Sequence, residues 1–307
     1  MRGLRAVTVL VVAALLSTAC GASQAGTAAY VGDTTVSVRS LQSQVDAVLA
    51  YRSGASDVRS QLPAVTARVL SQDVLRGLVQ AAVTRTGLAV DEKAIADQLA
   101  TLNPATVLAQ PAQNYLTPDT FAALVRDQLI LAQLGKQAWD GLGVTVDLVT
   151  ATDRGDAQNK ARRMAVSDAE SAAVVAEATA STQQAQQGLA LSPATAATLA
   201  ATPVFATPAG DAVAFALAGQ QSQAPQWYVA RILSRRTDAA VSTASGAVPA
   251  AQATISNTLS LGLSLLPQLA GDPQVRLNPR YGQWDPTASR VIAATDVPAA
   301  IVVTAAG

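Results

Sequence analysis

The sequence predicts an α+β protein that is mainly helical. Apolar residues recur at helical spacing over residues 65–79 and 121–139, which indicates two long amphipathic helices. Over residues 144–152 the pattern changes to an alternation that is typical of a strand. Helical spacing returns over residues 255–269. The order therefore predicts a helical part of the chain that a smaller α/β part interrupts.

Residues 1–20 have the pattern of a bacterial lipoprotein signal peptide. Two arginines precede the apolar run 6–16, which is too short to span a bilayer as a mature helix. Three small residues then lead into Cys20, the only cysteine of the chain. We therefore predict that a diacylglyceryl group is attached to Cys20. The alternative is an ordinary secretory signal whose cysteine is incidental.

A lipid on Cys20 would hold the mature chain on the extracytoplasmic face of the cell membrane. Each buried CH₂ group contributes roughly 0.8 kcal/mol, so two acyl chains give a stable anchor where one chain is marginal. Residues 21–27 are expected to form a short polar tether. No later stretch is apolar over the length of a membrane-spanning helix, so the lipid is the predicted membrane contact.

A hairpin and a series of helices are predicted after the tether. Residues 28–37 read as two short strands, and the Gly-Asp pair between them is typical of a two-residue turn. The helices that follow are expected to begin at capping residues, namely Ser37, Asp91 and Thr117. Gly87 fits the position just after the long second helix.

Residues 143–237 are expected to form a small β–α–β–β module. The strand over 144–152 is followed by an alanine-rich helical segment over 157–180, and residues 183–187 indicate a polar break. Two further strand-like runs read PVFATPAGDAVAFAL and QWYVARIL. Residues 238–254 contain mostly small side chains and are predicted to be a linker.

The most distinctive stretch of the chain is NPRYGQWDP at residues 278–286. Aromatic residues make up only 4% of the sequence, yet Tyr281 and Trp284 stand close together here, next to Arg280. Arginine and large aromatic residues dominate binding hot spots, and a buried tryptophan is also a strong packing anchor. The final residues, 288–307, lack capping and turn signals, so we expect a flexible, loosely held tail.

Several segments, taken in order, resemble one family. They read AAYVGDTTVSVRSLQSQVDAVL, RTGLAVDEKAIADQL, LTPDTFAALVRDQLIL and VRLNPRYGQWDP. Together they resemble lipoproteins with a SurA-type N-terminal domain, which are common in actinobacteria and related in architecture to SurA and PrsA. The resemblance implies that residues 28–142 and 255–287 pack into one discontinuous helical chaperone domain. Residues 143–237 would be an insertion that resembles a parvulin domain in outline.

The resemblance allows two roles for the distinctive stretch. In the first, residues 275–282 form a strand that returns to the hairpin, and Tyr281 and Trp284 cover the helices. Arg280 would then meet a carboxylate such as Asp33. In the second, Arg280 and the two aromatic side chains form a peptide-binding patch. We favour the structural role, because closing a domain across so many intervening residues requires a strong anchor.

The chain contains no histidine, and this restricts its chemistry more than any other feature. Ser-His-Asp and Cys-His catalysis, histidine acid–base catalysis and histidine-bound zinc are all excluded. With Cys20 predicted to carry the lipid, cysteine-bound metals are excluded too, so we predict neither a cofactor nor a metal. The 21 basic and 21 acidic residues balance, which gives no electrostatic basis for binding nucleic acid.

An active parvulin is expected to carry two histidines in its proline pocket. By the resemblance, Val146 or Asp147 stands at the first position and Val229 at the second, so the module is predicted to be degenerate. We therefore predict a chaperone or foldase-like protein that binds extended apolar segments of unfolded, exported polypeptides without catalysis. Two alternatives stay open: a weakly active peptidyl-prolyl isomerase, and a scaffold lipoprotein that binds one folded partner in the cell envelope.

Overall fold

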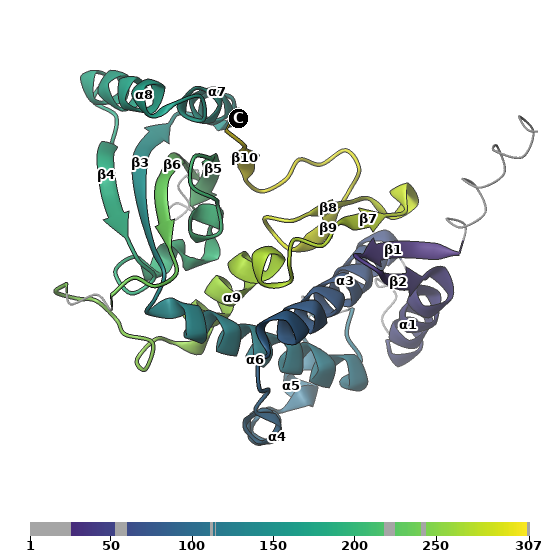
Figure 1. Ribbon diagram of the computed structural model, residues 1–307. Helices are drawn as coiled ribbons and strands as arrows, with labels where there is room; N and C mark the ends of the chain where they lie inside the picture. Colours follow the sequence, from purple (N-terminus) through teal and green to yellow (C-terminus); the bar gives the residue numbers. More distant parts are fainter. Residues whose placement is uncertain are drawn as a thin grey trace, which may run out of the picture.

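The structure, a computed structural model, describes residues 26–52, 60–110, 113, 115–217, 225–240 and 244–305. Within these residues the chain has an α+β fold with eight α-helices (Figure 1). The helices are α1 (Val38–Tyr51), α3 (Leu62–Thr86), α4 (Glu92–Thr101), α5 (Pro104–Leu108), α6 (Pro118–Trp139), α7 (Arg154–Met164), α8 (Asp168–Ala180) and α9 (Ile255–Leu269).

The strands form three sheets in the described part of the chain. They are β1 (Thr27–Val31), β2 (Thr34–Ser37), β3 (Gly143–Ala151), β4 (Ala185–Leu191), β5 (Ala212–Leu217), β6 (Gln226–Arg236), β7 (Val275–Leu277), β8 (Gln283–Asp285), β9 (Arg290–Ile292) and β10 (Ile301–Val303). Short 3₁₀ turns occur at η2 (Ala197–Ala201), η3 (Pro203–Phe205) and η4 (Pro279–Tyr281).

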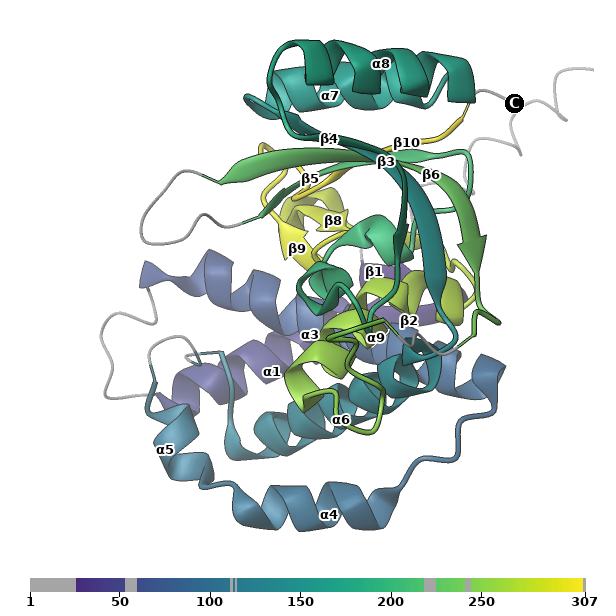
Figure 2. The same ribbon diagram turned by 90° about the vertical axis from the view of Figure 1, so that its left-hand side faces the viewer.

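Two lobes are visible when the molecule is turned (Figure 2). The sheet lobe is a five-stranded antiparallel sheet in the order β10-β5-β6-β3-β4, and α7 and α8 cover one of its faces. The other face of the sheet is turned toward α9 and α6. The helical lobe contains α1, α3, α4, α5, α6 and α9 together with the hairpin β1–β2 and the strands β7, β8 and β9.

The starts of α1, α4 and α6 and the end of α3 lie at the capping residues that the sequence predicted. The Ser37 hydroxyl accepts a hydrogen bond from the Ser40 N–H at 3.0 Å, as an N-cap of α1 should. Asp91 caps α4 in the same way, and Thr117 begins α6 with a capping box. Gly87 follows α3 in the left-handed conformation that favours glycine.

The strand predicted over residues 275–282 returns to the hairpin, but only as the short β7, because Pro279–Tyr281 form the 3₁₀ turn η4. It pairs with β1 in an antiparallel register that sets Val31 opposite Val275 and Ala29 opposite Leu277. The Asn278 side-chain nitrogen also donates to the Thr27 carbonyl oxygen at 3.2 Å, across 251 positions of sequence. The N-terminal hairpin and the C-terminal segment therefore form one three-stranded sheet, in the order β2-β1-β7.

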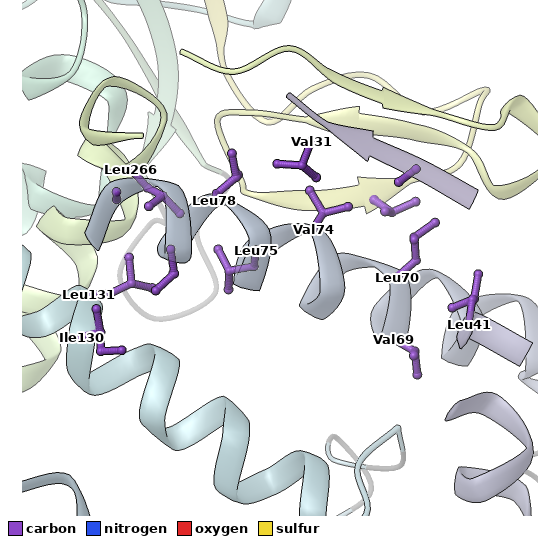
Figure 3. Packing of buried hydrophobic residues seen from close by; sticks show 14 of the residues in the cluster. Val31, Leu41, Val69, Leu70, Val74, Leu75, Leu78, Ile130, Leu131 and Leu266 are labelled. Atoms are coloured by element: carbon purple, nitrogen blue, oxygen red, sulfur yellow. The ribbon is translucent and has the colours of Figure 1, made fainter. Parts of the chain in front are cut away.

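The buried core of the helical lobe is organised around α3. Its apolar face, predicted over residues 65–79, meets side chains from β1, α1, α6 and α9 (Figure 3). The residues labelled there are Val31, Leu41, Val69, Leu70, Val74, Leu75, Leu78, Ile130, Leu131 and Leu266. Helices from both ends of the chain therefore bury their apolar surface against the same element.

Helices α6 and α9 approach each other with their backbones in contact. A Cβ atom added at Gly262 of α9 would overlap the Leu131 carbonyl oxygen of α6, and one added at Gly135 would overlap the Thr258 carbonyl oxygen. Only glycine leaves room for so close a crossing. The crossing therefore packs α9 against the N-terminal helices, although the residues of the sheet lobe lie between α6 and α9 in the sequence.

The predicted β–α–β–β order of the sheet lobe is wrong in three places. The run PVFATPAGDAVAFAL is a strand only over β5, and it begins with the 3₁₀ turn η3. The alanine-rich segment consists of two helices, because α7 ends at Met164 and the Ser167 hydroxyl caps α8 through the Glu170 N–H at 3.1 Å. The predicted polar break coincides with β4, which begins at Ala185 and pairs with β3. Polar residues are tolerated there because β4 is an edge strand with mostly exposed side chains.

The prediction of a loose tail over residues 288–307 is also wrong for the described part of that segment. Strand β9 pairs with β8, and β10 pairs with β5 at the edge of the five-stranded sheet. The fully buried Asp285 carboxylate accepts hydrogen bonds from the Thr287 N–H at 2.9 Å and from the Ala299 N–H at 2.7 Å. Contacts within the segment and the pairing of β10 with the distant β5 thus order residues that carry few capping or turn signals.

The two lobes share a buried cluster. Its members include Trp139 and Leu142 at the end of α6, Leu261 of α9, and Val146 and Ile232 of the sheet. The Trp139 Nε1 donates to the Val248 carbonyl oxygen at 2.8 Å, which holds the predicted linker against α6. The shared cluster indicates that the lobes stabilise each other, while separate folding of residues 143–237 stays a prediction.

The predicted membrane contact lies outside the described residues. Neither Cys20 nor the predicted signal over residues 1–20 falls within them. Among the described residues, no helix combines the length and the apolar character needed to cross a membrane.

Candidate functional site

The three side chains of the distinctive stretch lie on one short reversal of the chain. Arg280 and Tyr281 belong to η4, and Trp284 lies on β8. Gly282 separates them with a φ of 112°, and a Cβ atom there would overlap the Ile292 carbonyl oxygen. The reversal directs the side chains into different hollows, so Tyr281 and Trp284 do not form a single patch.

Arg280 does not contact the hairpin turn, so its predicted pairing with Asp33 is wrong. Its guanidinium lies over the Tyr281 ring, 4.5 Å from the ring centroid, and donates a hydrogen bond to the Tyr281 hydroxyl. The strand register explains the difference. The turn lies beside the start of β7, where the Gly32 N–H donates to the Gln274 carbonyl oxygen at 3.1 Å, whereas Arg280 follows the end of β7.

An apolar hollow of about 570 Å³ lies beside β7 and β8. Its walls come from α3, the end of α9, β7, β8 and the turns that join them, and we refer to it as the apolar hollow. The lining residues are Leu78, Pro267, Pro273, Val275, Leu277, Pro279, Gly282, Gln283, Trp284, Pro286 and Ala294. Gln283 is the one polar side chain among them, and none is charged.

Trp284 faces both the core of the helical lobe and the apolar hollow. It is half-buried, and part of its surface packs against the core of the helical lobe. It also lines the apolar hollow, next to Leu277 of β7. A side chain in this position can support the fold and still present apolar surface to a ligand.

A second hollow of about 860 Å³ lies on the other side of the same chain reversal. We refer to it as the arginine hollow, because its lining includes Arg68, Arg280 and Arg290 against one acidic residue, Asp296. The remaining lining residues are Pro63, Ala64, Ala67, Ser71, Gln72, Tyr115, Pro279, Tyr281, Gly282, Ser289, Val291, Ile292, Ala293 and Ala294.

Aromatic rings support two of the arginines in the arginine hollow. The Arg68 guanidinium lies over the Tyr115 ring at 5.3 Å, as Arg280 lies over Tyr281. Burial raises the pKa of the Tyr115 hydroxyl, and the nearby Arg68 charge opposes this shift. Tyr115 therefore stays neutral at physiological pH, and the arginines set the charge of the hollow.

A third hollow, of about 880 Å³, lies between the hairpin and α3. Asp73 lines it and accepts a hydrogen bond from the Gln44 side-chain nitrogen at 2.7 Å. Burial raises the pKa of Asp73, while the Gln44 hydrogen bond and the Arg76 charge act in the opposite direction. These contacts are local to the helical lobe.

The positions that stand in place of the parvulin histidines are closed. Asp147 and Val229 lie on the sheet face that α7 and α8 cover, and Asp147 accepts a hydrogen bond from the Ser171 hydroxyl at 2.7 Å. Val146 is buried on the opposite face, in the cluster that the lobes share. Asp147 and Val229 are therefore enclosed between the sheet and the covering helices, Val146 points to the opposite face, and none of the three lines the hollows described above.

Comparisons with known proteins give limited information. Neither a protein-family model nor a curated protein matches the sequence. The solved structures that share a remote likeness with the chain include two foldase proteins named PrsA. The one from Lactococcus lactis is 11% identical with a TM-score of 0.27, over 82% of this chain and 94% of that chain. The one from Streptococcus pneumoniae is 13% identical with a TM-score of 0.22, over 78% of this chain and 90% of that chain. At these TM-scores the likeness carries no argument about activity.

The sequence indicated part of this site and missed the rest. The unusual composition of residues 278–286 correctly marked the C-terminal segment as distinctive. Arg68, Tyr115 and Arg290 had no local signal, because α3, the stretch before α6 and β9 meet only in the folded chain. The apolar hollow likewise depends on the register of β7 against β1, which brings Val275 and Leu277 beside α3.

Proposed function

We propose that this protein is a lipid-anchored, extracytoplasmic chaperone of the foldase-like type, which holds extended apolar segments of exported polypeptides. The apolar hollow is the observation that carries the proposal. It combines an uncharged lining with β7, which is the edge strand of its sheet. Extended peptides commonly bind along such an edge, with alternate side chains in neighbouring pockets.

Holding requires burial of apolar surface and no cofactor. Each Å² of apolar ligand surface that is removed from water contributes roughly 25 cal/mol to the free energy of binding. This contribution does not depend on the order of the apolar side chains in the ligand. A hollow built from proline, leucine, valine and tryptophan side chains therefore suits many different apolar segments. The isomerase alternative has no support at the sheet, since Val146, Asp147 and Val229 are all buried.

Trp284→Ala is expected to weaken the holding of unfolded chains more than it weakens the fold. Because Trp284 is half-buried, its loss should cost less than the roughly 3–5 kcal/mol of a fully buried tryptophan. Suppression of the aggregation of an unfolded test protein should be largely lost, as followed by light scattering. A urea titration of the same variant measures its free energy of unfolding separately.

Trp227→Ala is the matched control for this experiment. Trp227 is also half-buried but lies on β6, away from the apolar hollow. Its replacement should leave the suppression of aggregation close to that of the unmodified chain. If Trp284→Ala suppressed aggregation as well as the unmodified chain does, the apolar hollow would not be the binding site for unfolded chains.

Cys20→Ala is expected to release the protein from membranes or leave an unprocessed precursor. The reason is that the predicted lipid is attached only through this sulfur, and the described residues contain no membrane-spanning helix. Fractionation of cells that express the variant, followed by mass determination of the N-terminus, measures both outcomes. Normal processing together with full membrane association would contradict the lipoprotein assignment.

A further inference from the structure

We infer that the arginine hollow binds carboxylates of the same polypeptide whose apolar segment occupies the apolar hollow. The preferred clients would then be apolar stretches that are followed or preceded by acidic residues. This inference rests on the proposed function and names a substrate class for it. Three features of the arginine hollow support the inference. They are the charge of its lining, the stacking of two of its arginines on tyrosine rings, and its position next to the apolar hollow.

The charge of the lining favours an anionic ligand. Arg68, Arg280 and Arg290 line the hollow against the single carboxylate of Asp296. Within the described residues, neither Arg280 nor Arg290 takes part in a salt bridge. A guanidinium group offers a planar fork of donors that matches a carboxylate, so an acidic side chain is a suitable partner.

The aromatic rings hold two of these arginines over the hollow. Arg280 lies 4.5 Å from the centroid of the Tyr281 ring, and Arg68 lies 5.3 Å from that of Tyr115. Stacking uses the face of the guanidinium group and leaves N–H groups at its edge for an anion. Arg290 is exposed and belongs to β9, whose pairing with β8 fixes its backbone.

The position of the hollow links it to the apolar hollow. Pro279, Gly282 and Ala294 line both hollows, so the two adjoin across the same chain reversal. An extended chain that leaves the apolar hollow at this point meets the arginines next. This continuity favours a polypeptide ligand over an anionic membrane surface, which would be recognised by charge without an adjoining apolar hollow.

Two synthetic peptides with the same leucine- and valine-rich sequence test the inference. One ends in two glutamates with a free carboxylate, and the other ends in two glutamines with an amide. With the full chain in detergent micelles, fluorescence anisotropy should show about three- to tenfold tighter binding of the acidic peptide at low salt. Added sodium chloride should reduce this preference, because exposed charges are screened.

The double variant Arg280→Gln with Arg290→Gln should remove the preference and leave the affinity for the amidated peptide unchanged. The control is Arg39→Gln with Arg162→Gln, which removes the same charge from exposed positions on α1 and α7 outside the arginine hollow. The control should keep the preference. A control that loses the preference equally would show that net charge alone is responsible, and would overturn the inference.

The remaining outcomes separate this inference from the proposed function. Equal binding of the two peptides by the unmodified chain overturns the inference and leaves the proposed function standing. Binding of neither peptide contradicts the proposed function itself. Vesicles of phosphatidylglycerol and of phosphatidylcholine form the third arm. If the arginine double variant loses only a preference for the anionic vesicles and keeps its preference for the acidic peptide, the hollow is a membrane contact and the inference fails.

Discussion

Replacing Gly262 with alanine is expected to lower the free energy of unfolding by at least about 3 kcal/mol. The added Cβ would overlap the Leu131 carbonyl oxygen of α6, and the same contact involves the backbone nitrogen of Gly135. No side chain can rotate to relieve an overlap with backbone, so α9 must move away from α6. That movement would expose Leu131 and Leu266, which are fully buried in the unmodified chain.

Gly77→Ala is the matched control for this prediction. Gly77 also lies inside a helix, but a Cβ atom there would meet the Val31 side chain at an ordinary 3.4 Å. Alanine is favoured over glycine in a helix by up to about 1 kcal/mol, so this variant should be neutral or slightly more stable. Urea titrations followed by far-UV circular dichroism give both values. An unchanged midpoint in Gly262→Ala would show that α6 and α9 do not meet as closely as the structure has them.

The features that the sequence predicted correctly depend on neighbouring residues. Helix starts at Ser37, Asp91 and Thr117 are set by side chains that bond to N–H groups three positions away. The amphipathic face of α3 repeats over several turns, so its burial could be predicted as well. The return of β7 was predicted only with the help of the resemblance, and its pairing with β1 confirms that step.

The features that the sequence missed depend on contacts between distant segments. Strand β10 pairs with β5, and the Val291 N–H of β9 donates to the Ser71 hydroxyl of α3 at 2.8 Å. The polar sequence of β4 is acceptable only because the strand lies at a sheet edge. The predicted pairing of Arg280 with Asp33 is wrong because the register of β7 against β1 places the hairpin turn beside the start of β7, whereas Arg280 follows its end.

Trp139→Ala is expected to lower the free energy of unfolding by roughly 3–5 kcal/mol, as for other fully buried tryptophans. The ring fills the cluster between α6, α9 and the sheet, and its Nε1 bonds to the Val248 carbonyl oxygen at 2.8 Å. A typical domain is stable by only about 5–15 kcal/mol, so the change should be evident in a urea titration. Trp139→Phe keeps much of the volume and loses the hydrogen bond, so its smaller effect separates packing from hydrogen bonding.

The same variant tests whether the lobes are stabilised together. Trp139 lies at the end of α6, directly before the boundary near Gly143 that was predicted to separate an independent module. If the shared cluster couples the lobes, amide hydrogen exchange in Trp139→Ala should accelerate in both α3 and β6. If the module is independent, protection should fall in one lobe and persist in the other. Since Trp139 and Ile232 contribute to one cluster from opposite sides of that boundary, we expect the two lobes to lose protection together.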